Sequence, residues 1–90
     1  MTYASVRFAV ADYTTWRAGF DSNEPGRRAA GATGANQVYR DLEQPNTVTL
    51  ILEWNGPARA RQFFQDPALR QLQQKSGVIG VPETRVMNKS

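Results

Sequence analysis

Three stretches of this chain are predicted as strands, and in the first and third of them apolar side chains recur at every second position, which is the pattern of a strand with one buried face. The first stretch runs from Tyr3 to Val10, the second from about Ala35 to Leu42, and the third from Thr47 to Trp54. Every second residue of each stretch is therefore expected to face a shared core. The pattern predicts at least three half-buried strands.

Residues with turn preferences separate these stretches and introduce a fourth strand. Between the second and third stretches, Pro45 fixes its own φ and Asn46 tolerates a turn conformation, so a hairpin connection is expected there. A shorter last strand is expected from about Glu83 to Met87. Pro82 before it favours the edge of a sheet, because proline has no N–H to donate to a neighbouring strand.

Bulky apolar residues at spacings of three and four predict a helix after the first strand. Tyr13, Trp16 and Phe20 share one stripe of this helix, and Asp12 is a suitable N-cap. A Pro-Gly pair then interrupts the helix, and a short helical piece is expected over residues 27–30. This segment therefore covers one face of the sheet with aromatic side chains.

A second helical segment is expected between the third and fourth strands. Gly56 or the residue before it caps the segment, and Pro57 lies in its first turn. Asp66 followed by proline indicates a second cap and a restart, since proline cannot donate into the preceding turn. Gly77 is well placed to end the segment. The apolar residues expected to be buried on it are Ala60, Phe63, Phe64, Leu69 and Leu72.

Two strand–helix–strand units in succession, each with a right-handed crossover, predict a ferredoxin-like α+β plait. Its four-stranded antiparallel sheet has the order 4-1-3-2, with the helices on one face. The whole chain, residues 1–90, is expected to form a single domain. If Leu42 pairs with Thr47, Tyr39 lies opposite Leu50 and Gln37 opposite Leu52. In that register Tyr39 shares the helix-covered face with the apolar residues of the third strand.

The other face of the predicted sheet is of mixed polarity, too apolar for full exposure and too polar for a closed core. Such a face favours a homodimer in which two sheets pack against each other. Arg7 and Glu53 are expected to pair across neighbouring strands on this face. The residues assigned to it are Ser5, Arg7, Ala9, Val38, Arg40, Thr49, Ile51 and Glu53.

Composition removes several classes of function. The chain has no cysteine and no histidine, which excludes disulfides, thiol nucleophiles, serine–histidine triads and most zinc sites. The net charge of +3 is spread over scattered arginines rather than a basic stripe, so neither a nucleic-acid nor a membrane partner is expected. No leader or long apolar run is evident, and a cytoplasmic protein is expected.

The pattern resembles the dimeric α+β barrel superfamily, which includes the antibiotic biosynthesis monooxygenases and related polyketide cyclases. The resemblance covers nearly the whole chain and rests mainly on structural signatures. The residues that carry it are Trp16, Phe20, Val38-Tyr39-Arg40-Asp41, Pro45-Asn46, Thr47-Val48, Glu53-Trp54, Ala60, Phe63, Pro67-Ala68-Leu69, Gly77-Val78 and Pro82.

This resemblance implies a small-molecule pocket within each protomer, between the sheet and the helices. Tyr39 and Arg28 are the candidate catalytic residues, because a hydrogen-bond donor in such a pocket stabilises a developing phenolate or enolate. Arg27, next to Arg28 after the first helix, is considered for the same role. The polar ends of Tyr39 and Gln37 would need partners there. The candidate substrate-binding residues are Trp16, Phe20, Gln37, Trp54 and Phe63.

Within that superfamily, the missing histidine argues against the heme-degrading and histidine-dependent branches, and a glycine-rich phosphate loop is also absent. No metal and no cofactor are expected. The favoured hypothesis is a cofactor-independent monooxygenase or cyclase acting on an aromatic or polyketide-like substrate. Two alternatives stay open: a non-catalytic dimer that binds a hydrophobic ligand, and a structural or assembly protein whose aromatic residues are sealed core.

Overall fold

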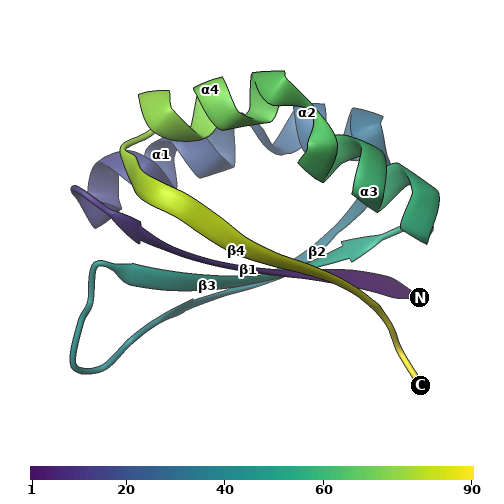
Figure 1. Ribbon diagram of the computed structural model, residues 1–90, viewed down its shortest axis with the longest axis horizontal. Coiled ribbons are helices and arrows are strands. Elements are labelled where there is room, and N and C mark those ends of the chain that lie inside the picture. Colours follow the sequence, from purple (N-terminus) through teal and green to yellow (C-terminus); the bar gives the residue numbers. More distant parts are fainter.

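Four helices lie side by side on one face of a four-stranded antiparallel sheet and leave the opposite face uncovered (Figure 1). The computed structural model describes residues 1–90. The strands are in the order β2-β3-β1-β4, which confirms the predicted plait. The elements are β1 (Thr2–Val10), α1 (Tyr13–Ser22), α2 (Glu24–Ala30), β2 (Ala32–Arg40), β3 (Thr47–Trp54), α3 (Pro57–Gln65), α4 (Pro67–Lys75) and β4 (Val78–Asn88).

Three predicted boundaries differ from the structure. Strand β2 begins and ends earlier than expected, at Ala32 and Arg40, and α2 begins at Glu24. Strand β4 begins at Val78, so that Pro82 lies within the strand instead of before it. The edge position of β4 is as predicted, and an edge strand tolerates the missing proline N–H.

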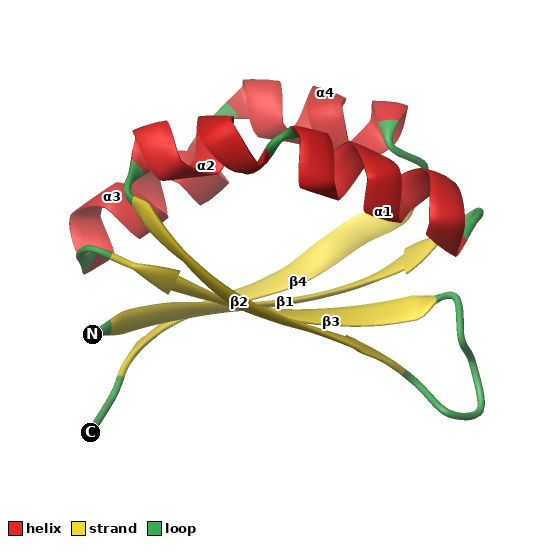
Figure 2. Ribbon diagram, turned by 180° about the vertical axis from the view of Figure 1, so that it is seen from behind, coloured by secondary structure: helices red, strands yellow, loops and turns green.

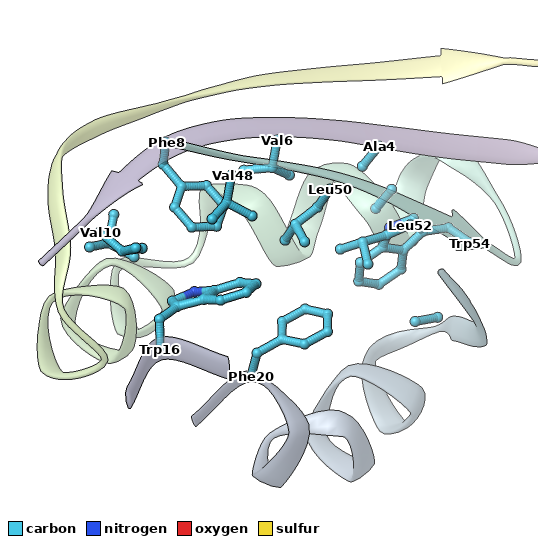
Figure 3. Packing of buried hydrophobic residues seen from close by; sticks show 13 residues of the cluster. Ala4, Val6, Phe8, Val10, Trp16, Phe20, Val48, Leu50, Leu52 and Trp54 are labelled. Atoms are coloured by element: carbon cyan, nitrogen blue, oxygen red, sulfur yellow. The ribbon is translucent and has the colours of Figure 1, made fainter. Parts of the chain in front are cut away.

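The core lies between the helices and the two central strands. Strand β3 alternates perfectly, with Val48, Leu50, Leu52 and Trp54 buried and their neighbours less so. Figure 3 shows Trp16 and Phe20 of α1 turned toward this set of sheet side chains. The alternation of the sequence and the helical stripe thus meet in one cluster, whose other buried members are Ala4, Val6, Phe8, Val10, Ala32, Ala60 and Val78.

The predicted register between β2 and β3 is wrong by one residue. Tyr39 pairs with Thr49 and Gln37 with Ile51, so both side chains lie on the open face of the sheet. Tyr39 is 53% exposed there. Because side chains alternate across a strand, a shift of one residue moves the whole set to the other face. Val38 and Arg40, assigned to the open face from the sequence, lie on the helix side, opposite Leu50 and Val48.

The connection between β2 and β3 explains this register. The Asp41 amide donates to the Thr47 carbonyl at 3.0 Å, so these two residues close the hairpin instead of Leu42 and Thr47. The Asp41 carboxylate accepts from Arg7 of β1 at 2.7 Å. That pair holds Asp41 on the open face, and Tyr39, two residues earlier, lies on the same face.

The polar groups of the open face bond to one another. Arg7 pairs with Asp41, and not with Glu53 as predicted, because Arg7 lies opposite Thr49 in the β1–β3 register. Glu53 instead accepts from the Tyr3 hydroxyl at 3.1 Å and from Thr33 at 2.8 Å. The hydrogen bond to this carboxylate raises the pKa of the Tyr3 phenol. The open face therefore presents polar groups that are already partnered.

Asp12 caps α1 as predicted. Its carboxylate accepts from the Thr15 amide at 2.9 Å and from the Thr15 hydroxyl at 2.7 Å. These two bonds hold the pKa of the Asp12 carboxyl below its ordinary value. A carboxyl whose pKa is lowered on folding stabilises the fold above its unfolded pKa, and this contribution is lost as the pH falls through the folded pKa.

Replacing Asp12 with asparagine is therefore expected to remove one pH-dependent part of the stability. Asparagine keeps a capping oxygen but does not titrate. The stability of the wild type relative to Asp12→Asn should decrease as the pH falls below about 4, near the unfolded pKa of an aspartate. Urea unfolding of both proteins across a pH series measures this difference. A difference that does not change with pH would contradict the role given to the cap.

None of the helices combines the length and the apolar character required to cross a membrane.

Candidate functional site

A small apolar cavity of about 70 Å³ lies between the sheet and the helices. Strands β1 and β3 form its floor, and helices α1 to α4 form its walls. Eleven of its fifteen lining residues are hydrophobic, and the polar ones are Asn23, Arg27, Gln73 and Ser76. The hydrophobic ones are Val6, Phe8, Trp16, Phe20, Leu50, Leu52, Phe63, Phe64, Leu69, Leu72 and Val78.

Aromatic rings form one wall of the cavity. The Trp16 ring lies 5.1 Å from the Phe20 ring in a stacked arrangement and 5.3 Å from the Phe8 ring. These are favourable separations for aromatic pairs. Trp16 and Phe20 are one helical turn apart on α1, so the predicted stripe places both rings over the sheet (Figure 3). The wall is suited to a flat, apolar ligand.

Arg27 supplies the one charged side chain in the lining. It is only 8% exposed, its guanidinium lies 3.7 Å from the centre of the Phe20 ring, and its Nη1 donates to the Phe20 carbonyl at 2.8 Å. Burial lowers the pKa of this guanidinium, although an arginine stays charged at neutral pH. The cavity thus combines an apolar interior with a cation at its border.

Helix α4 closes the cavity loosely. It contains no fully buried residue, and Leu72, which lines the cavity, is 38% exposed. Next to α4, a groove of about 190 Å³ shares five lining residues with the cavity: Asn23, Arg27, Phe63, Leu69 and Leu72. Arg27 therefore lies where the inner cavity meets the outer groove.

The C-terminal end of α4 approaches α1 closely. A side chain at Gly19 would place its Cβ 2.9 Å from the Ser76 hydroxyl oxygen. Glycine is costly within a helix, by roughly 1 kcal/mol relative to alanine. Here its small size has a structural reason, because it lets the end of α4 pack against α1 and seal that side of the cavity.

Three of the five predicted substrate-binding residues line the cavity: Trp16, Phe20 and Phe63. Trp54 does not. It is completely buried in the core, 5.0 Å from the Phe63 ring and 5.6 Å from the Phe64 ring. Its indole Nε1 has no hydrogen-bond partner. The surroundings of Trp54 are those of a packing residue.

The structure places the other three predicted site residues outside the cavity, so the positions expected for them are wrong. Tyr39 and Gln37 lie on the open face of the sheet, where the Tyr39 hydroxyl donates to the Gln37 side chain at 2.9 Å. Arg28 lies on the outer side of α2, where it pairs with Glu24 and extends along Gly34 of β2. The one-residue register shift places Tyr39 and Gln37 on the open face. The position of Arg28 on α2 directs its side chain away from the cavity.

Three polar lining residues, Asn23, Gln73 and Ser76, were not considered from the sequence, and Arg27 was considered only beside Arg28. The periodicity of the sequence contains the signal for all four of these polar residues. Asn23 and Arg27 continue the three-and-four spacing that includes Phe20, so an unbroken stripe runs from α1 into α2. Gln73 and Ser76 follow the apolar residues of α4 by the same spacing. Extending both stripes past the helix breaks would have placed these side chains at the site.

The lining supports binding and charge stabilisation better than proton transfer. No carboxylate or phenol is among the lining residues, and nowhere in the chain do three or more carboxylates gather in a way that suits a metal ion. The arginine and the amides of Asn23 and Gln73 can stabilise an anion by donating hydrogen bonds. The site is therefore equipped to bind a flat molecule that carries or develops negative charge.

Solved structures with the same architecture place this fold among known ones. A protein from Bordetella bronchiseptica, named for the antibiotic biosynthesis monooxygenases, aligns with a TM-score of 0.76 at 18% identity, over 99% of this chain and 96% of that chain. SnoaB from Streptomyces nogalater, a cofactor-independent oxygenase, aligns with a TM-score of 0.70 at 14% identity, over 99% and 92%. The chain therefore shares the ferredoxin-like α+β plait of these proteins.

The predicted resemblance to this fold is thereby confirmed at the level of structure. No protein-family model matches the chain, and no curated protein matches it by sequence. A conserved protein from Methanosarcina mazei aligns equally well, with a TM-score of 0.71 at 15% identity, over 99% of this chain and 92% of that chain. At these identities the likeness establishes the α+β plait of the single chain, and function has to be argued from the site.

Proposed function

We propose that this protein is a cofactor-independent enzyme, of the monooxygenase or cyclase type, that acts on an aromatic or polyketide-like small molecule. The observation that carries the proposal is the apolar cavity beside Trp16 and Phe20 with the Arg27 guanidinium at its border. It gains support from the shared fold with SnoaB, which is a cofactor-independent oxygenase. The proposal places substrate in the cavity and the adjoining groove.

A reaction of this kind needs a substrate that supplies its own electrons. Oxidation of an activated methylene to a carbonyl releases four electrons, and O₂ accepts four: one oxygen atom enters the product and the other leaves as water. The enzyme has to favour the phenolate or enolate form, hold it flat and exclude water. Arg27 would stabilise the anion, since a partly desolvated guanidinium acts more strongly than one in water. A cyclase would use the same anion as a carbon nucleophile without O₂.

We further propose that two copies of the chain pack through the open faces of their sheets. The partnered polar groups support this, because Arg7, Glu53 and Tyr3 already have hydrogen bonds that survive removal from water. Apolar side chains lie between them: Ala9, Ile51 and Ile79, of which Ile79 is 56% exposed in the single chain. A self-complementary face is what a two-fold dimer requires.

The enzyme hypothesis predicts that Arg27→Met lowers turnover by roughly a hundredfold to a thousandfold, the range found for losing one anion-stabilising donor. Methionine keeps most of the buried volume and removes the charge. The measurement is conversion of phenols with an activated methylene, and of linear polyketones, with and without oxygen. Arg28→Met and Tyr39→Phe are matched controls, and both should retain wild-type rates because these residues lie outside the cavity.

A non-catalytic ligand-binding protein is the second candidate. The specific observation in its favour is that no lining side chain is a general base near neutral pH. Ligands that raise the melting temperature but are recovered unchanged across the panel would favour this role and overturn the enzyme hypothesis. Equal rates in the wild type and Arg27→Met would overturn the role given to Arg27 even if turnover is found.

A further inference from the structure

We propose that the cavity selects ligands that bear one planar anionic group, such as a carboxylate or an enolate, beside a flat apolar body, with Arg27 as the counter-ion. This inference rests on the proposed function in that both use the same cavity. It goes further in naming the charge of the ligand when it binds, whether or not a reaction follows.

The carboxylates near Arg27 already have other partners. Asp21, in the last turn of α1, pairs with Arg17 at 3.2 Å, and Glu24 pairs with Arg28. Asp66, which lines the outer groove, caps α4 by accepting from the Ala68 amide at 2.9 Å. Arg27 itself makes no ion pair within the chain, and its one hydrogen-bond acceptor is the neutral carbonyl of Phe20. A buried charge is ordinarily paired. This arrangement leaves the pairing of Arg27 to a bound anion.

The geometry around Arg27 suits a planar anion. A guanidinium has five N–H donors, and a bidentate contact with a carboxylate or an enol system uses two of them. Nη1 donates to the Phe20 carbonyl. Nε and Nη2 are not among the buried nitrogens that lack a partner, so both are accessible enough to donate to a ligand. Because the guanidinium lies against the Phe20 ring, an anion bound in the guanidinium plane lies beside the aromatic wall.

The position of Arg27 predicts where the apolar part and the anionic part of the ligand lie. The inner cavity of about 70 Å³ is apolar, while the outer groove of about 190 Å³ adds Gly26, Asp66 and Ala68. An engineered cavity that binds benzene measures about 150 Å³, so a ring would occupy the cavity and part of the groove. The anionic group would then lie at the junction, against Arg27, with the Asn23 amide beside it.

The test compares benzoate with benzamide, which have nearly the same shape and differ in charge. Titration of each into the ¹⁵N-labelled full chain, followed by the indole signal of Trp16, gives two dissociation constants. We expect benzoate to bind about tenfold or more tightly than benzamide, as a charge-assisted bidentate contact predicts. In Arg27→Met this preference should disappear, in Arg27→Lys it should persist in part, and in Arg28→Met it should be unchanged.

Inorganic phosphate separates this site from a simple anion site. It carries charge without an apolar body, so it should not compete with benzoate at equal concentration. Equal affinity for benzoate and benzamide, or equal competition by phosphate, would overturn the inference. If Arg27→Met fails to fold, the wild-type ratio and the Arg27→Lys value still decide it.

The outcomes also separate this inference from the proposed reaction. A preference for benzoate together with no turnover of any substrate would support the anion site and remove the enzyme hypothesis. Turnover of a substrate without a preference for anions would support the enzyme hypothesis and overturn the anion site.

Discussion

Replacing Trp54 with alanine is expected to lower the free energy of unfolding by about 3–5 kcal/mol, as for other buried tryptophans. Trp54 is completely buried at the end of β3 and packs against the Phe63 and Phe64 rings. Removing it leaves a void that the two phenylalanines cannot fill without moving α3. For a domain whose total stability is about 5–15 kcal/mol, this is a severe loss. Urea unfolding followed by far-UV circular dichroism measures it.

The matched control is Leu42→Ala. Leu42 is 98% exposed in the β2–β3 loop, so its truncation should change the stability of a single chain by no more than about 0.5 kcal/mol. A loss below about 1 kcal/mol in Trp54→Ala would contradict the assignment of Trp54 to the core. In that case the sequence-based prediction that Trp54 contacts substrate would regain its basis.

Introducing a charge at Ile51 is expected to convert a dimer into monomers. Ile51 lies on the open face of the central strand β3, opposite Ser5 of β1 and Gln37 of β2. If two sheets pack through these faces, Ile51→Arg buries an unpaired guanidinium at the middle of the contact. Such a change should weaken association by roughly two orders of magnitude or more. Size-exclusion chromatography with light scattering, at micromolar concentration, gives the mass in solution.

Ala58→Arg supplies the control for this experiment. Ala58 is exposed on α3, on the helical side of the sheet, so the same charge there should leave the mass unchanged. A wild-type protein that is monomeric at all accessible concentrations would reject the dimer outright. An Ile51→Arg variant that stays dimeric, with native circular dichroism, would place the contact elsewhere.

The starts of α1, α3 and α4 could be predicted because their signals are local, and the strand order followed from the connections between the elements. Alternation in β1 and β3 marks the buried face, and Asp12 and Asp66 act as N-caps where the sequence places them. Right-handed crossovers then leave few ways to connect the strands. For this reason the sheet order β2-β3-β1-β4 followed from the sequence alone.

The register of β2 could not be predicted in the same way. Its burial pattern shows no regular alternation, because the polar residues Asn36 and Arg40 lie beside Val38 on its helix side. The register depends on a contact between residues far apart in sequence, the pair of Arg7 with Asp41. The residues Pro45 and Asn46 predict that a turn is present, but they do not predict how many residues it contains. Because the predicted register was wrong by one residue, Tyr39 and Gln37 were assigned to the pocket instead of the open face.

Only part of the candidate site could be predicted, because the rest also depends on tertiary packing. Aromatic side chains such as Trp16 and Phe20 indicate a core or a pocket by their size and spacing, but the same signal was present for Trp54. Whether an aromatic ring borders a cavity depends on how α3 and α4 are bent at Asp66, which is a tertiary property. Arg27 continues the α1 stripe, but this is seen only when the spacing is counted across the Pro-Gly pair that separates the two helices.

Both edges of the sheet are irregular, and this limits how copies of the chain can join. Strand β4 contains Gly80, with φ +73°, and Pro82, and its pairing with β1 shifts between Arg7 and Ala9. Strand β2 has its own register shift, between Ala32 and Asn36. Figure 2 shows the sheet nearly edge-on and strongly twisted, with the outer strands β2 and β4 crossing in projection. Bulges and edge prolines oppose the addition of further strands. The edges of the sheet therefore oppose its growth from molecule to molecule, which disfavours the stacking of strands into fibres.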